Sequence, residues 1–114
     1  MELDIKVEAH NGARVVVLTG SVNGLTAERM QAALLAEVEG GHVQLVGDLA
    51  GVEYTSSAGL RALLATVKQA RSQGGDLRLA AVTPAVRKGL ELSGFTTVLR
   101  LFDDVETAVS SYAG

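Results

Sequence analysis

Apolar and polar residues alternate at the start of the chain. Every second residue over 3–9 is apolar, and this period of two predicts a strand with one buried face, near the edge of a sheet. The dipeptide Asn11-Gly12 follows, and both residue types tolerate the positive φ of a tight hairpin turn. The run over 15–18 is apolar throughout, which indicates a strand covered on both faces. We therefore expect the first two strands to form an antiparallel hairpin.

Later in the chain, apolar residues recur at spacings of three and four, as on the buried side of a helix. This spacing predicts helices over 27–39 and 57–73, each followed by glycines that end it. Thr26 is the expected N-cap of the first. Thr83-Pro84 predicts the start of a third helix, because Thr caps and Pro needs no N–H at the first helical position. The pattern Asp103-x-x-Glu106 resembles a capping box and introduces a fourth helix.

Short apolar runs between the helices predict the remaining strands. We expect strands over 43–47, 76–82 and 98–102, with loops over 20–25 and 48–55. The resulting order β-β-α-β-α-β-α-β-α is typical of a parallel sheet with right-handed crossovers. The predicted fold class is α/β. We expect one domain over 1–114, with a mixed, mostly parallel sheet that begins with an antiparallel hairpin and carries about four helices.

The composition limits the chemistry that the chain can carry. Its 114 residues include 10 Lys and Arg against 13 Asp and Glu, and no basic run that would bind nucleic acid. The absence of cysteine excludes disulfides and thiol chemistry, and two histidines are too few for a His-rich metal site. No apolar run approaches the roughly 18 residues of a membrane span, and no signal peptide pattern begins the chain. We expect a soluble cytoplasmic protein without metal, cofactor or membrane insertion.

The serine cluster over 55–59 is the strongest candidate for chemistry. A hydrolase elbow would read Gly-x-Ser-x-Gly around Ser57, but Thr55 takes the place of the first glycine and only Gly59 matches. Neither histidine is close in sequence, and glycine-rich phosphate loops and dinucleotide fingerprints are absent. Catalysis by Ser57 is therefore the least favoured hypothesis, and no catalytic residue is assigned.

Ser57 has a structural and a functional interpretation. Its place before an apolar helical pattern is that of an N-cap, and the local pattern alone favours this role. The N-terminus of a helix also tolerates a phosphate, because free N–H groups and the helix dipole point toward it. A phosphate on Ser57 would add a charge of about −1.5 to −2 at the surface without unfolding the domain, which suits a switch.

The segment over 48–61 resembles the signature of STAS-domain proteins of the anti-sigma factor antagonist family. It reads Asp-Leu-Ala-Gly-Val-Glu-Tyr-Thr-Ser-Ser-Ala-Gly-Leu-Arg. The family's signature is a strand, an Asp, a small or polar step, an aromatic residue and then Ser-(Ser or Ala)-Gly-Leu at the start of a helix. The segments over 20–26 and 83–95 resemble the family's loop before its first helix and its third helix. The resemblance covers nearly the whole chain, and the predicted element order is also the family's order.

The resemblance implies a phosphorylation switch in a bacterial protein that is not an enzyme. Ser57 corresponds to the family's phosphorylated serine. The implied partners are an anti-sigma factor that is itself an HATPase-type serine kinase, and a PP2C-type phosphatase that reverses the modification. The unmodified antagonist binds the kinase and frees the sigma factor, whereas the phosphorylated antagonist does not bind. The resemblance also implies a monomer when free.

The chain departs from the family pattern at two places. Some members carry Asp before the target serine, where this chain has Ser56, so Ser56 is a competing phosphorylation site although the register favours Ser57. The family's acidic pair in the first loop is replaced by Ser21 and Asn23, which makes the partner contacts of that loop less negative. A related set of STAS proteins acts as scaffolds or accessory subunits of signalling or lipid-transport assemblies without phosphorylation, and this alternative stays open.

The expected partner surface combines the two predicted loops with the first turns of the second helix. Asp48 either orders its loop through backbone N–H groups or contacts the partner, and Arg61 either is solvated or meets a phosphate. Tyr54 is expected to be a packed anchor, and Gly59 to allow close packing at the helix start. The expected partner-binding residues are Ser21, Asn23, Asp48, Thr55, Ser56, Ser57, Ala58, Gly59 and Arg61.

Overall fold

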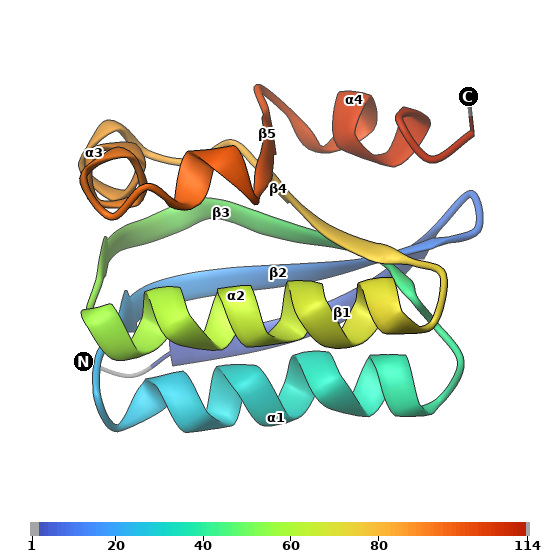
Figure 1. Cartoon of the computed structure of the whole chain (residues 1–114), viewed down its shortest axis with the longest axis horizontal. Coiled ribbons are helices and arrows are strands. Elements are labelled where there is room, and N and C mark those ends of the chain that lie inside the picture. The colour runs from blue at the N-terminus through green and yellow to red at the C-terminus, as the bar shows by residue number, and fades with distance from the viewer. Residues whose placement is uncertain (1–2, 114) are drawn as a thin grey trace.

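A five-stranded mixed sheet forms the centre of the computed structural model, which describes residues 3–113 (Figure 1). The strands lie in the order β1-β2-β3-β4-β5, with β1 antiparallel to β2 and the other neighbours parallel. This confirms the predicted α/β fold class; the expected domain limits, 1–114, extend beyond the described residues at both ends. The elements are β1 (Leu3–His10), β2 (Ala13–Val22), α1 (Thr26–Glu39), β3 (Gln44–Thr55), α2 (Ser57–Ser72), β4 (Asp76–Ala80), α3 (Pro84–Leu92), the 3₁₀ turn η1 (Phe95–Thr97), β5 (Arg100–Phe102) and α4 (Val105–Ser110).

The helices cover the two faces of the sheet unequally (Figure 1). α1 and α2 lie side by side on one face, where their buried apolar residues join those of α3 and of the sheet in the larger core cluster. α4 packs on the other face over a smaller cluster that includes Val46, Ala80 and Val109. Among residues 3–113, none of the helices has both the length and the apolar character that a membrane span needs.

The hairpin forms where the sequence predicts it. Asn11 and Gly12 have φ values of 47° and 86°, as a tight turn between antiparallel strands requires. The apolar run of β2 is largely covered on both faces, as predicted. In β1 the predicted apolar face is only partly buried, because Leu3 is buried but Val7 is 38% exposed. α1 contacts β1 through Arg29, whose Nη1 donates to Leu3 O at 2.9 Å.

β3 is much longer than predicted. The apolar pattern predicts a strand over 43–47 and a loop over 48–55, and the loop prediction is wrong because β3 continues through it. This second half of β3 passes the end of β4 and pairs only with β2, which itself extends into the predicted loop over 20–25. Leu49 and Val52 of this half are buried in the core. Pairing with a distant strand therefore overrides the local turn signals.

The elements after β4 begin with a predicted cap and end with a shortened strand. α3 starts as predicted, with Pro84 first and with Thr83 as its N-cap, whose Oγ1 accepts the Val86 N–H at 3.5 Å. β5 covers only the last three residues of the predicted strand over 98–102. The first two residues of that range donate their N–H groups to Phe95 O at 3.0 and 2.8 Å, which keeps them in the turn before the strand.

The C-terminal helix α4 has a side-chain cap at its start and is attached to the sheet after its end. Asp104 is the N-cap, because its Oδ1 accepts a backbone N–H of the first turn at 2.7 Å; the predicted cap, Asp103, is wrong by one residue. After the helix, the hydroxyl oxygen of Tyr112 lies 2.6 Å from Leu45 O and 2.9 Å from Asp76 O. Since these carbonyls belong to β3 and to β4, the tyrosine joins the end of the chain to two neighbouring strands.

Candidate functional site

The ends of β2 and β3 lie side by side, which brings the two expected partner segments together. Ser21 pairs with Tyr54, and Val22 with Thr55. The Ser56 N–H then donates to Val22 O at 2.7 Å. The start of α2 is therefore attached directly to the end of β2.

The two serines at the start of α2 have different roles. Ser56 is the N-cap, with an extended backbone and with its Oγ accepting the Gly59 N–H at 3.2 Å. The assignment of this cap to Ser57 from sequence is wrong by one residue, because the backbone changes from extended to helical only after Ser56. Ser57 is the first helical residue and is exposed, and within residues 3–113 its hydroxyl has no hydrogen-bond partner.

Gly59 allows α2 to approach the strands closely, as predicted. The residue is buried, and a Cβ at this position would overlap with Thr55 Oγ1 and lie 2.5 Å from Val22 Cγ1. A larger side chain would push the first turn of α2 away from the sheet. The position of Ser57 therefore depends on the glycine two residues later.

The loop before α1 is ordered by its own side chains. Asn23 Oδ1 accepts the N–H groups of Leu25 and Thr26 at 2.9 and 3.0 Å. Thr26 Oγ1 accepts the Asn23 N–H at 2.9 Å and donates to Ser21 O at 2.9 Å. Thr26 is the first residue of α1 and not its predicted N-cap; the N-cap position is Leu25, which makes no side-chain cap bond, and the Asn23 side chain accepts the free N–H groups of Leu25 and Thr26 instead. Asn23 and Ser21 thus fix the shape of the loop.

Two large apolar side chains are exposed in these segments. Tyr54 is 56% exposed, so the prediction that it is a packed anchor is wrong. A register shift after Gly20 places one extra residue on β3, and this bulge turns Tyr54 to the face opposite to Val52. Leu25 is 86% exposed. The sequence analysis does not identify Leu25, although an apolar residue in a polar loop is a signal for it.

Asp48 lies away from the other expected partner residues. It is in the middle of β3, opposite Val17 of β2 and Ala80 of β4. The strand between Asp48 and Thr55 spans roughly 23 Å, at about 3.3 Å per residue. Asp48 Oδ1 accepts the Ala50 N–H at 3.1 Å. The carboxylate therefore orders the backbone where β3 leaves β4, which is the structural role weighed for it from sequence.

Arg61 lies one turn after Ser57 and is exposed. It forms no ion pair with any residue in the described part of the chain. Together with Glu28 and Ala58 it lines a groove of about 400 Å³ between α1 and α2. Gly24 of the loop also lines this groove, which therefore continues the surface around Ser57 along the two helices.

The element order and the turn at the start of α2 match a known domain family. The family model described as the STAS domain matches residues 4–108. The chain belongs to the STAS domain family. It is 34% identical to BtrV of Bordetella bronchiseptica, provisionally named an anti-sigma factor antagonist, over 110 residues that cover 96% of this chain and 95% of that relative.

Solved structures of other proteins have the same fold. The crystal structure of an anti-sigma factor antagonist from Mycobacterium paratuberculosis superimposes with a TM-score of 0.90 at 29% identity, over 99% of this chain and 96% of that chain. SpoIIAA of Bacillus in its phosphorylated form has the same fold, with a TM-score of 0.74 at 17% identity, over 96% of this chain and 99% of that chain.

The surroundings of Ser57 limit the chemistry that its hydroxyl can carry out. Ser57 follows the end of β3, whereas His42 precedes the start of that strand and His10 lies at the hairpin. Among residues 3–113 no histidine therefore stands beside Ser57 as a general base. The first turn of α2 contains no acidic residue. Added negative charge at Ser57 would thus meet the free N–H groups of a helix N-terminus.

Proposed function

We propose that this STAS domain is an anti-sigma factor antagonist, a binding protein that is switched by phosphorylation of Ser57. The observation that carries the proposal is the exposed hydroxyl of Ser57, which has no hydrogen-bond partner in the described part of the chain. The names of the relatives support the class of function. In this proposal the chain catalyses nothing and is the substrate of other enzymes.

Ser57 is a better phosphorylation site than Ser56. The Ser56 hydroxyl accepts the Gly59 N–H, and loss of such a cap costs about 1 kcal/mol. Modification of Ser56 would therefore disturb the start of α2, whereas modification of Ser57 would leave the cap in place. Ser57 is also the more exposed of the two serines, so a kinase can reach its hydroxyl without local unfolding.

A phosphate on Ser57 would change the surface and leave the fold as it is. The N-terminus of α2 stabilises negative charge, and Arg61 stands one turn further along the helix. Ser21, Thr55, Ser56 and Ala58 border the same surface. We infer that the unmodified surface binds an anti-sigma factor of the HATPase kinase type. Burial of an unpaired dianion in that interface would cost about 3–5 kcal/mol, which is roughly 10²–10⁴ in affinity.

In the proposed cycle the kinase transfers a phosphoryl group from ATP to Ser57 Oγ and is then released. A PP2C-type phosphatase hydrolyses the phosphoserine and restores the binding form. The exposed side chains of Leu25 and Tyr54 are well suited to contact the partner, because burial of apolar surface is favourable and Tyr is enriched among the residues that dominate interface affinity.

The test combines mass spectrometry with binding measurements. We expect phosphate on Ser57 after incubation with the kinase and ATP, both in the wild type and in the matched control Ser56→Ala. Ser57→Ala should bind the kinase and resist modification, and Ser57→Asp should bind poorly in isothermal titration calorimetry. If Ser57 stays unmodified and all variants bind equally, the chain is a non-switching scaffold. Labelling of Ser57 by a serine-reactive fluorophosphonate would indicate a hydrolase instead.

A further inference from the structure

β5 is the last strand of the sheet and has an open outer edge. It pairs with β4 alone. Phe102 O accepts the Ala81 N–H at 3.0 Å, so the N–H and C=O of Phe102 point toward β4. In a parallel pair, alternate residues direct both backbone groups to the same side. Leu101 therefore directs its N–H and C=O outward, where an extended segment can pair with them.

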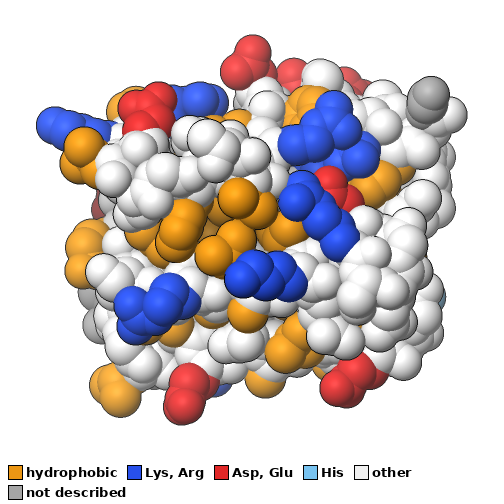
Figure 2. All heavy atoms as spheres, in the orientation of Figure 1, with side chains coloured by type: hydrophobic (Ala, Val, Ile, Leu, Met, Phe, Trp, Pro, Cys, Tyr) orange, Lys and Arg blue, Asp and Glu red, His pale blue; other side chains and the backbone are white. Residues whose placement is uncertain are grey.

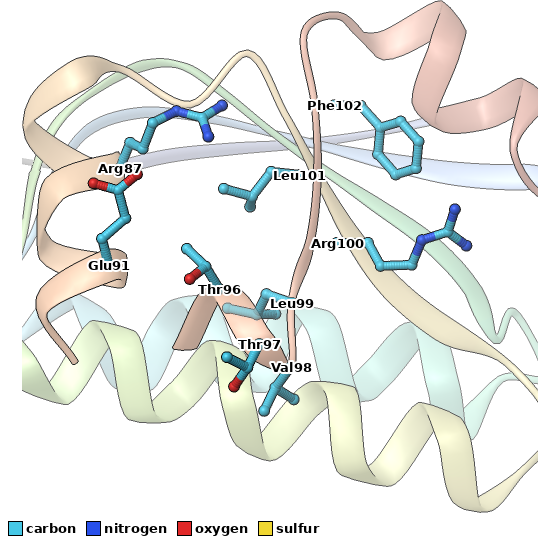
Figure 3. Close-up of a pocket in the computed structure, with 9 residues that line it drawn as sticks. All are labelled: Arg87, Glu91, Thr96, Thr97, Val98, Leu99, Arg100, Leu101 and Phe102. Atoms are coloured by element: carbon cyan, nitrogen blue, oxygen red, sulfur yellow. The ribbon is translucent and has the colours of Figure 1, made fainter. Parts of the chain in front are cut away.

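A groove of about 400 Å³ lies between this edge and α3. In Figure 3, Leu101 points into the groove from β5, and Arg87 and Glu91 border it from α3. Arg100 and Phe102 point to the opposite side of β5 (Figure 3), with the Arg100 guanidinium 5.2 Å from the centroid of the Phe102 ring. A segment along the edge would have an apolar neighbour on one side and a cation on the other.

Positive charge is concentrated in the segment from the start of α2 to β5, and two of its basic residues, Arg87 and Arg100, line the groove. The segment over 57–102 contains seven of the ten Lys and Arg but only two of the thirteen Asp and Glu, a net charge of +5 against −8 for the rest of the chain. One of these two acids, Asp76, is buried and paired with two arginines. Among the described residues, Arg87 and Arg100 form no ion pair. Figure 2 shows Lys and Arg side chains around a hydrophobic patch on this face.

We propose that this groove is a second docking surface, separate from the Ser57 site, for an extended acidic segment of a partner protein that adds as a strand to β5. Backbone pairing with Leu101 positions the segment. The side chain opposite Leu101 lies in the groove, where the charges of Arg87 and Glu91 offset each other and Leu101 is its apolar neighbour, so this residue is apolar. Its two neighbours lie on the face of Arg100 and are acidic. The recognised pattern is acidic-apolar-acidic.

The test uses the full chain and two acetylated, amidated peptides, Glu-Val-Glu-Val-Glu and its opposite-charge counterpart Lys-Val-Lys-Val-Lys. In titrations of ¹⁵N-labelled protein followed by NMR, the acidic peptide should shift the amide signals over 99–102 and in α3, and leave those over 55–59 unchanged. Arg100→Glu should weaken binding of the acidic peptide by at least about tenfold, since a repulsion replaces an attraction. The lysine peptide should not bind.

Lys6→Glu is the matched control. Lys6 is exposed on β1, the strand at the other edge of the same sheet, and the substitution changes the net charge by the same amount. This variant should keep the affinity of the wild type. Thermal unfolding establishes that the variants are folded, and Arg100→Gln against Lys6→Gln gives the same comparison if a charge reversal prevents folding.

Several results would overturn the proposal. These are no shifts with the acidic peptide, equal binding of both peptides, equal weakening by the substitutions at Lys6 and Arg100, and shifts confined to β1 or to the Ser57 site. Binding to phosphatidylglycerol vesicles or to an oligonucleotide that requires Arg100, without binding of the acidic peptide, would also contradict it. The surface would then serve a lipid or a nucleic acid.

Discussion

At the scale of single residues, the start of α2 depends on the absence of one side chain. Gly59→Ala would place a Cβ against Val22 and Thr55, which are held in place by strand pairing. Ala favours a helix over Gly by about 1 kcal/mol. The overlap outweighs this gain, and we expect the free energy of unfolding to fall by about 1–3 kcal/mol. Urea unfolding measures the change.

Gly89→Ala is the matched control for this substitution. Gly89 lies within α3, and a Cβ added there has no atom within 4 Å. The free energy of unfolding should therefore rise by about 0.5–1 kcal/mol. If both variants lose similar stability, the close approach of α2 to β2 and β3 is not what makes a glycine necessary at position 59.

The same scale shows what sequence reasoning could and could not decide about the site. The start of α2 at Ser57 was predicted correctly, because a polar run before an apolar helical pattern is a local signal. Which serine caps the helix depends on how far the backbone of β3 stays extended, and the ψ of 171° at Ser56 places the change one residue later than predicted. The exposure of Tyr54 depends on a bulge against β2, for which the sequence has no local signal.

At the scale of elements, Tyr112 anchors the short helix α4 to the sheet. Tyr112→Phe would leave Leu45 O and Asp76 O without this donor, and we expect a loss of about 1–2 kcal/mol in the free energy of unfolding. Burial, and then the nearby Asp76 carboxylate, raise the pKa of Tyr112 above its usual range. A raised pKa in the folded state means that the protonated form is favoured by folding.

The stability from Tyr112 is therefore present below the ordinary tyrosine pKa of about 10 and is lost as the pH rises above it. Urea unfolding between pH 8 and pH 11 should show a steeper loss for the wild type than for Tyr112→Phe. Tyr54→Phe removes an exposed hydroxyl and should keep the slope of the wild type. Parallel slopes for the wild type and Tyr112→Phe would contradict the anchoring role.

Elements with a strong local period were predicted correctly, and those defined by distant partners were not. The predicted helices over 27–39 and 57–73 agree with α1 and α2 to within one residue at each end, because their buried positions repeat at helical spacing. The second half of β3 was missed, because its pairing with β2 alone lies outside any local pattern. This extension carries the site beyond the end of β4. Because the strand was predicted too short, the shape of the surface around Ser57 was also predicted wrongly.

At the scale of the whole molecule, the fold separates two surfaces of different chemistry. The Ser57 site stands where β2, β3 and the starts of α1 and α2 meet, whereas the second groove lies between α3 and β5. Between them stands the core that α2 and α3 share with the sheet. The two proposed partners therefore bind through different elements. Substitutions at one surface should abolish binding there and leave binding at the other surface unchanged.

A last prediction distinguishes a phosphate that blocks the partner surface from one that unfolds the start of α2. In Ser57→Asp, the carboxylate stands at the N-terminus of α2, where the helix dipole favours negative charge by about 0.3–1 kcal/mol. The free energy of unfolding should thus equal or slightly exceed that of the wild type, while the affinity for the anti-sigma kinase falls. Ser57→Asn, of the same shape without the charge, should stay closer to the wild type in both respects. Thermal unfolding and calorimetry on the same preparations measure the two quantities. If the stability of Ser57→Asp fell along with its affinity, phosphorylation would act by melting the start of α2, and the proposed surface switch would be wrong.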